Sequence, residues 1–162
     1  YPNGSYRKEI EELFQSLGIA YARTTNSSHK YNLPENPLEW HPTCHHNDPR
    51  LMEHAKFVAE TTKWQYLRLL YVWGHSYEFN NNDNWNVIEE FCQYMGGRSD
   101  IWYATNIEIV NYMQVLKNLQ FTARCDGVFN PSAQSAWLNV QVSDDSYEII
   151  EAKGGCFTSF VK

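Results

Sequence analysis

The sequence predicts an α/β domain built on parallel strands, followed by a small β-rich appendage. Up to about residue 120, segments with helical spacing of apolar residues alternate with short apolar runs, which is typical of parallel α/β domains. After Phe121 the pattern changes to short alternating runs separated by Gly, Pro, Asn and Asp, which indicates antiparallel strands. We therefore expect a β/α domain over residues 1–126 and a β-rich tail over residues 127–162.

Four segments have the periodicity of amphipathic helices. In the first, apolar residues recur from Ile10 to Leu17 at positions i, i+3, i+4 and i+7, so that one face of a helix is apolar. Gly18 follows directly, as glycine often does at the C-terminus of a helix. The expected helices cover residues 7–17, 49–62, 85–95 and 106–119.

The apolar runs between these helices are expected to form the parallel strands. They cover residues 19–23, 38–43, 66–73 and 101–105. Two polar segments rich in turn-forming residues, 24–37 and 79–84, are expected to be loops. In the tail, the expected antiparallel strands cover residues 121–125, 136–142 and 147–152.

The run from Leu69 to Trp73 is the clearest buried strand, and it ends at Gly74 and His75. In α/β barrels, catalytic residues commonly lie at the C-terminal end of such a strand. We therefore interpret His75 as a functional histidine. An imidazole titrates near neutrality, and a neighbouring carboxylate such as Glu78 can tune it for acid–base work. The alternative is a loop histidine that caps a turn.

A second group of histidines lies at His41, His45 and His46. His41 and His45 have the spacing of a two-histidine metal pair on a helix, but Pro42 lies between them and the surrounding sequence indicates a strand that leads into a loop. Zinc would need a third protein ligand, which no spacing specifies. A polar site wall made of imidazoles and a plain surface loop are the other interpretations.

Composition narrows the class of partner. The formal net charge is −6 and there is no long basic run, which argues against a nucleic-acid binder and against binding to an anionic membrane. The 11 Tyr, 8 Phe and 6 Trp suit a protein that handles sugars, and they equally suit a core or an interface. The 4 Cys show no CxxC pairing, so we expect mostly free, buried thiols. The opening residues indicate a turn that leads directly into a helix, so we expect a piece of a longer protein.

Several segments resemble the C-terminal half of a NodB-type polysaccharide deacetylase of carbohydrate esterase family 4. The resemblance is strongest from Leu69 to Asn106, and it covers roughly residues 1–130. The segments that carry it are Tyr1–Tyr6, Leu38–His46, Trp73–Phe79, Asn84–Trp85, Ile88–Phe91 and Ile101–Asn106.

This resemblance implies a partial distorted (β/α) barrel and the metal-dependent hydrolysis of N- or O-acetyl groups on a carbohydrate. It implies that His75 is the general acid, and that the backbone N–H of Asn3 donates to the oxyanion. It places Trp40 at the wall of the acetyl pocket, and Trp73 and Tyr77 at the substrate. In the family, Zn²⁺ or a similar divalent ion polarises the carbonyl and activates water.

The family's first motif, Thr-Phe-Asp-Asp, and its second, His-x-x-x-His-Pro, have no counterpart in this sequence. We therefore expect this chain to bind no family metal by itself, and an N-terminal half or a second chain to complete the barrel. Two alternatives remain open: a non-catalytic carbohydrate-binding α/β module, and a metal protein that uses His41, His45 and His46.

Overall fold

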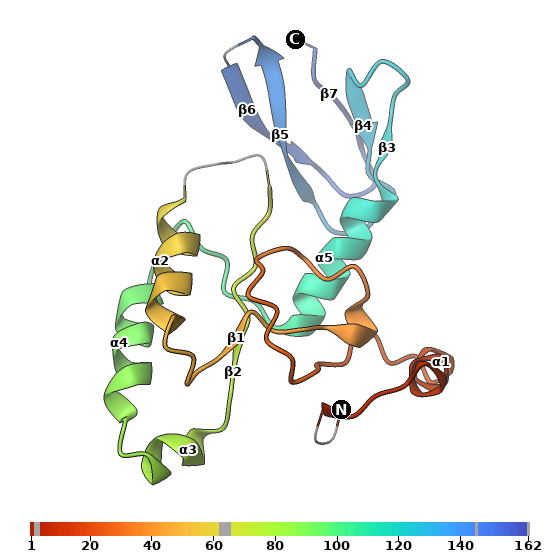
Figure 1. The fold of residues 1–162 in the computed structure, drawn as a ribbon. Coiled ribbons are helices and arrows are strands. Elements are labelled where there is room, and N and C mark those ends of the chain that lie inside the picture. The colour runs from red at the N-terminus through yellow and green to blue at the C-terminus, as the bar shows by residue number, and fades with distance from the viewer. Residues whose placement is uncertain (2–3, 62–65, 145, 162) are drawn as a thin grey trace. The chain divides into compact units, whose positions relative to one another are not determined.

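The computed structural model describes residues 1, 4–61, 66–144 and 146–161. The chain divides into two compact units, Tyr1–Tyr103 and Ala104–Lys162 (Figure 1). The division expected from the sequence, after residue 126, falls instead inside the antiparallel pair of β3 (Gln120–Phe121) and β4 (Gly127–Phe129). The helix α5 (Asn106–Asn118) contacts β5 (Ala136–Ser143), so it belongs with the strands that follow it.

The first unit contains four α-helices and a short 3-10 helix among its described residues. These elements are α1 (Lys8–Ser16), η2 (Pro37–Glu39), α2 (Leu51–Glu60), α3 (Ser76–Asn81) and α4 (Trp85–Met95). Helices were predicted at α1, α2 and α4, and these predictions are confirmed. The helix α3 lies partly where a loop was predicted. Phe79 is only 6% exposed and fixes this short helix by its burial, whereas the asparagine run begins only at its last turn.

The parallel strands of the first unit are much shorter than predicted. The strand β1 (Cys44–His45) pairs in parallel with β2 (Val72–Trp73), and Arg23 forms an isolated parallel bridge with Trp40. Immediately before β1 and β2, Thr43 Oγ1 accepts a hydrogen bond of 3.0 Å from the backbone N–H of Tyr71. A side chain therefore takes the place of a ladder carbonyl, and regular pairing stops there.

The mixed α/β class is confirmed, but the described residues form no closed barrel, so the partial barrel stays a prediction. Residues 101–105, predicted as a strand, have an irregular backbone that leads into α5. Part of the strand predicted at 66–73 borders residues 62–65, which lie outside the described residues.

Among its described residues, the second unit contains α5 and five antiparallel strands. Thr105 and Glu108 form a reciprocal capping box at the start of α5, which satisfies backbone donors that the helix leaves open. The strands form a sheet in the order β3–β4–β7 and a separate β5–β6 hairpin, with β6 at Ser146–Ala152 and β7 at Phe157–Ser159. The antiparallel strands predicted at 136–142 and 147–152 are thus present as β5 and β6, whereas most of the strand predicted at 121–125 is the turn between β3 and β4. The hydrophobic core of the second unit consists of Val115, Val128, Ala136 and Ala152.

Among the described residues, no helix combines the length and apolar character needed to cross a membrane.

Candidate active site

The candidate site lies at the C-terminal ends of β1 and β2. Because these strands are parallel, their carboxyl ends meet at one edge, which brings His45 and His46 close to His75. All three imidazoles surround the carboxylate of Glu78, in the first turn of α3. The distances are 2.9 Å from His75 Nδ1 to Oε1, 2.9 Å from His46 Nε2 to Oε2 and 3.2 Å from His45 Nε2 to Oε2. We call these four residues the Glu78 cluster.

Gly74 makes this arrangement possible. A Cβ atom at this position would lie 1.7 Å from His46 Nδ1, so any side chain would displace the imidazole. The His46 ring is 4% exposed and packs against Phe79, with 4.2 Å between ring centroids, and its backbone N–H donates to the carbonyl of Trp73. The glycine that ends the predicted strand is therefore needed for the close packing of His46.

The protonation pattern of the cluster follows from its hydrogen bonds. The hydrogen bond from His75, together with the charges of the three imidazoles, lowers the pKa of Glu78, so its carboxylate is anionic. Burial, reinforced by neighbouring His46, lowers the pKa of His45. His45 Nδ1 accepts the backbone N–H of Asn47 at 3.2 Å, so the proton of the neutral ring is on Nε2, which faces Glu78.

His75 is the accessible member of the cluster. Its side chain is 49% exposed, and Nδ1 is engaged by Glu78, so the other nitrogen, Nε2, is the one that can meet a substrate. Tyr77 stacks on the imidazole with 5.2 Å between centroids, and Trp73 meets it edge-on at 5.9 Å. The guanidinium of Arg23 lies 4.0 Å from the centroid of the Trp73 ring.

Three of the predicted site residues, His75, Trp73 and Tyr77, are thus adjacent. Trp40 is 1% exposed and packs between Tyr21 and Tyr71, so it is a core residue and offers no face to a substrate. That placement corrects the predicted pocket wall. Asn3, the predicted oxyanion donor, lies outside the described residues.

The histidine trio proposed as a metal site does not assemble. His41 Nδ1 lies 2.6 Å from Thr24 Oγ1, and its Nε2 lies 3.6 Å from Glu39, so His41 is not part of the Glu78 cluster. His45, His46 and Glu78 do approach one another as a possible ligand group. However, His45 Nε2 carries the ring proton, which leaves two ligands where zinc takes at least three. The cluster does not fit the family's metal.

Cys44, next to His45, is not a nucleophile. It is fully buried, and burial raises the pKa of its thiol to about 11, so the thiolate is not populated near neutrality. The other three cysteines, Cys92, Cys125 and Cys156, are exposed thiols, so the prediction of buried thiols is wrong for them.

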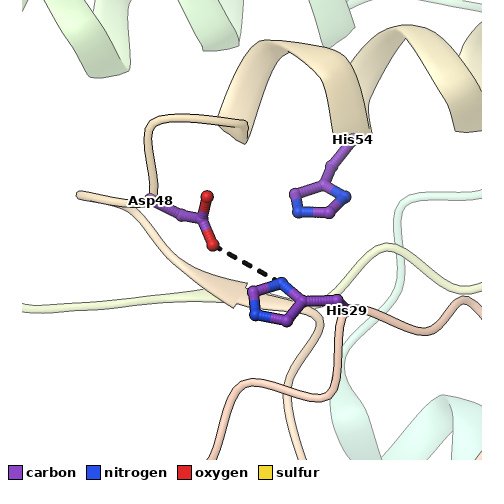
Figure 2. Close-up of side chains that lie close together, drawn as sticks. All are labelled: His29, Asp48 and His54. Carbon is purple, nitrogen blue, oxygen red and sulfur yellow. Dashed lines mark ion pairs between the residues drawn. The ribbon is translucent and has the colours of Figure 1, made fainter.

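A second group of ligand-type side chains lies elsewhere in the first unit. His29, Asp48 and His54 each offer one ligand atom, and these atoms lie within 4.8 Å of one another (Figure 2). We call these three residues the Asp48 cluster. No sequence pattern indicates this cluster, because its members come from a loop, the turn before α2 and α2 itself, with no recognisable spacing.

Two hollows of about 450 Å³ each lie in the second unit, over β5 and its neighbours. No histidine lines either of them, so they lack the acid–base chemistry of the Glu78 cluster.

Comparison with known proteins adds no relative: no family model, curated protein or solved structure matches the chain.

Proposed function

We propose that the chain is a carbohydrate deacetylase-type hydrolase in which His75 donates a proton to the departing group of an acetylated sugar. The observation that carries the proposal is the hydrogen bond of 2.9 Å between His75 Nδ1 and Glu78 Oε1 at the C-terminal end of β2. A carboxylate on Nδ1 fixes the tautomer of the ring and stabilises the imidazolium, as an orienting acid does in hydrolases. The resemblance to NodB-type deacetylases supports the same role.

The surroundings of His75 suit a carbohydrate. Tyr77 is 60% exposed and stacks on the imidazole, and Trp73 meets the same ring edge-on. Aromatic rings combine a large apolar face with a polar group at one end, so they can pack on the C–H face of a pyranose next to the reacting centre. Trp73 and Tyr77 are therefore the proposed substrate-binding residues.

In the proposed reaction, water adds to the acetyl carbonyl carbon. The bond from that carbon to the sugar's nitrogen or oxygen then breaks, which releases acetate. Protonated His75 gives its Nε2 proton to the leaving nitrogen or oxygen, so that the sugar departs as an amine or an alcohol. The other ring proton stays on Nδ1, and Glu78 accepts a hydrogen bond from it throughout. In this proposal, an N-terminal half or a second chain supplies the base that takes a proton from the attacking water. The backbone N–H of Asn3 donates a hydrogen bond to the oxyanion.

The experiment is acetate release from acetylated oligosaccharides, measured with and without added Zn²⁺ or Co²⁺ on a version of the chain extended at its N-terminus by the half that supplies the base. Removing a general acid costs roughly 10²–10⁴-fold in rate, so His75→Gln should release acetate at least about 100-fold more slowly than the wild type. His41→Gln removes a histidine outside the cluster and should retain the wild-type rate. Equal rates for His75→Gln and the wild type would overturn the proposal.

The aromatic pair of half-buried Trp73 and exposed Tyr77 also supports a second candidate function, a carbohydrate-binding module without hydrolysis. That function predicts binding of acetylated oligosaccharides that is weakened by Tyr77→Ala, retained by His75→Gln and never accompanied by acetate release. The deacetylase predicts acetate release that depends on His75.

A further inference from the structure

We propose that His29, Asp48 and His54 form a binding site for a divalent transition-metal ion of the Zn²⁺ class, separate from the Glu78 cluster and independent of the proposed deacetylase function. Two imidazoles and one carboxylate are a ligand set that such ions favour, with positions left for water or a substrate atom. Nothing in the sequence spacing indicates this site, which exists only because the fold joins a loop to α2.

His54 carries the strongest evidence. The residue is 5% exposed, and its Nε2 is a buried nitrogen with no hydrogen-bond partner among the described residues. Figure 2 shows that the edge of its ring faces Asp48 and His29. A buried polar atom that lacks a partner is costly, so this nitrogen calls for a ligand that is not part of the chain.

The other nitrogen of His54 has the partner that a metal-bound histidine needs. Its Nδ1 lies 2.7 Å from the hydroxyl of Tyr31. A tyrosine hydroxyl can act as a hydrogen-bond acceptor as well as a donor, so it can accept a hydrogen bond from the Nδ1–H of His54. In that tautomer Nε2 keeps its lone pair, and the Tyr31 hydroxyl orients the ring as supporting partners do at metal sites.

Asp48 divides its two oxygens between the fold and the cluster. Oδ1 accepts the backbone N–H of Arg50 at 2.8 Å, at the start of α2, which fixes the carboxylate in place. Oδ2 faces His29 Nδ1 at 3.5 Å, which is too long for a direct hydrogen bond. This spacing leaves room for an ion to be contacted by both atoms.

His29 completes the set from the loop. Its backbone N–H donates to the carbonyl of Thr43 at 3.0 Å, and its φ of 52° lies in the left-handed region, which is uncommon for a residue other than glycine. Its ring lies nearly parallel to that of His54, at 15° and 5.6 Å between centroids. The side chain is 38% exposed, so the ring can rotate to aim Nδ1 at a shared ion.

A positively charged side chain, Arg50, already contacts the cluster. The Arg50 guanidinium lies 3.0 Å from His29 Nδ1, and its Nε donates to Asp48 Oδ1 at 3.4 Å. The Arg50 side chain is 48% exposed, so it can swing into solvent at little cost when an ion enters. We infer that Arg50 neutralises Asp48 in the metal-free protein and competes with the metal for the same place.

The test is a calorimetric titration of the full chain with Zn²⁺ alone, with the absorption spectrum of added Co²⁺ as a second readout of ligand type. We expect one ion per chain. His29→Gln changes an accessible side chain, and Asp48→Asn keeps an oxygen for the Arg50 N–H, so both variants should fold. Each removes a direct ligand, so each should weaken binding by more than the roughly 10–100-fold that a lost supporting partner costs.

Arg50→Gln should change the Zn²⁺ affinity in the opposite direction. Removal of the competing positive charge should tighten binding by about tenfold. His41→Gln and His45→Gln are the matched controls and should bind like the wild type. The proposal is overturned if the wild type binds no Zn²⁺, if His29→Gln and Asp48→Asn bind as tightly as the wild type, or if His45→Gln loses the ion. Acetate release plays no part in these measurements, so a failure of the deacetylase proposal would leave them unaffected.

Discussion

The Glu78 and Asp48 clusters each bring histidines to one carboxylate, three in the Glu78 cluster and two in the Asp48 cluster, yet the structure gives them different chemistry. In the Glu78 cluster, the backbone N–H of Asn47 occupies His45 Nδ1, and a backbone N–H can only donate. In the Asp48 cluster, the hydroxyl of Tyr31 occupies His54 Nδ1, and a hydroxyl can also accept. The first partner forces the proton onto Nε2, whereas the second lets Nε2 keep its lone pair.

The comparison shows that residue composition alone does not identify a metal site. The partner of the second ring nitrogen decides whether a histidine serves as a proton donor or as a ligand. The carboxylates differ in the same way, since both oxygens of Glu78 face imidazoles, whereas Asp48 uses one oxygen for the backbone of α2.

The largest effect should come from Gly74→Ala, which would disrupt the Glu78 cluster and leave the Asp48 cluster in place. The new Cβ would meet His46, whose ring is buried against Phe79, so we expect a loss of about 3 kcal/mol or more in the free energy of unfolding. Urea denaturation measures it. Gly97→Ala is the control, because it meets no atom within 4 Å and bears only the cost of its φ of 71°, about 1–2 kcal/mol. Equal losses for the two variants would contradict the close packing described here.

Glu78→Gln tests whether the two clusters act separately, because it removes one negative charge from the Glu78 cluster and keeps the shape of the side chain. It takes away the anion that orients His75, so we expect acetate release to fall by about 100-fold while Zn²⁺ affinity stays unchanged. Asp48→Asn should do the reverse. Glu90→Gln, at an exposed position on α4, is the matched control for the loss of a carboxylate. A single variant that abolished both properties without unfolding the chain would merge the two clusters into one site.

Tyr31→Phe should have a smaller effect, confined to the Asp48 cluster. It removes the hydroxyl on His54 Nδ1 and keeps the ring that stacks on Phe57. We expect Zn²⁺ affinity to fall by about tenfold, as is usual for loss of a supporting partner. Calorimetric titration measures this change, with Tyr77→Phe as the control. Unchanged affinity would show that the hydroxyl does not set the tautomer.

The smallest effect is a pH dependence of stability that both clusters share. Burial lowers the pKa of His45 and of His54, so each is neutral in the folded chain at a pH where the unfolded chain begins to bind a proton. Their contribution is therefore complete above the ordinary histidine pKa of about 6.5, and it is lost as the pH falls below that value. The Tm should drop by a few degrees between about pH 7.5 and pH 5.

In His54→Gln this drop should be smaller, because glutamine does not titrate. A drop in this variant as large as that of the wild type would assign the pH dependence to other groups.

The sequence predicts the local features of this fold better than the long-range ones. The helical periodicity locates α1, α2 and α4, and the run that ends at Gly74 locates His75 at the end of β2. The pairing of His75 with Glu78 is also predictable, because they are three residues apart. Strand length is not predictable here, since the hydroxyl of Thr43 replaces a backbone acceptor.

The remaining site residues depend on contacts that no local pattern encodes. Glu78 meets His46 from 32 positions away, and His29 reaches Asp48 from a loop with an unusual φ. Trp40 misled the prediction because an aromatic residue in a short strand fits a core and a sugar-binding wall equally well. Only the packing between Tyr21 and Tyr71 distinguishes these two roles.

The double use of Asp48 has a consequence for motion. Because Oδ1 holds the Arg50 N–H at the first turn of α2 while Oδ2 faces the cluster, an ion bound to Oδ2 would restrain the end of the helix as well. Amide hydrogen exchange at Arg50 and Leu51 should then slow when the ion binds, although neither amide touches it. The opening of one helical turn would thus report the occupancy of the cluster beside it.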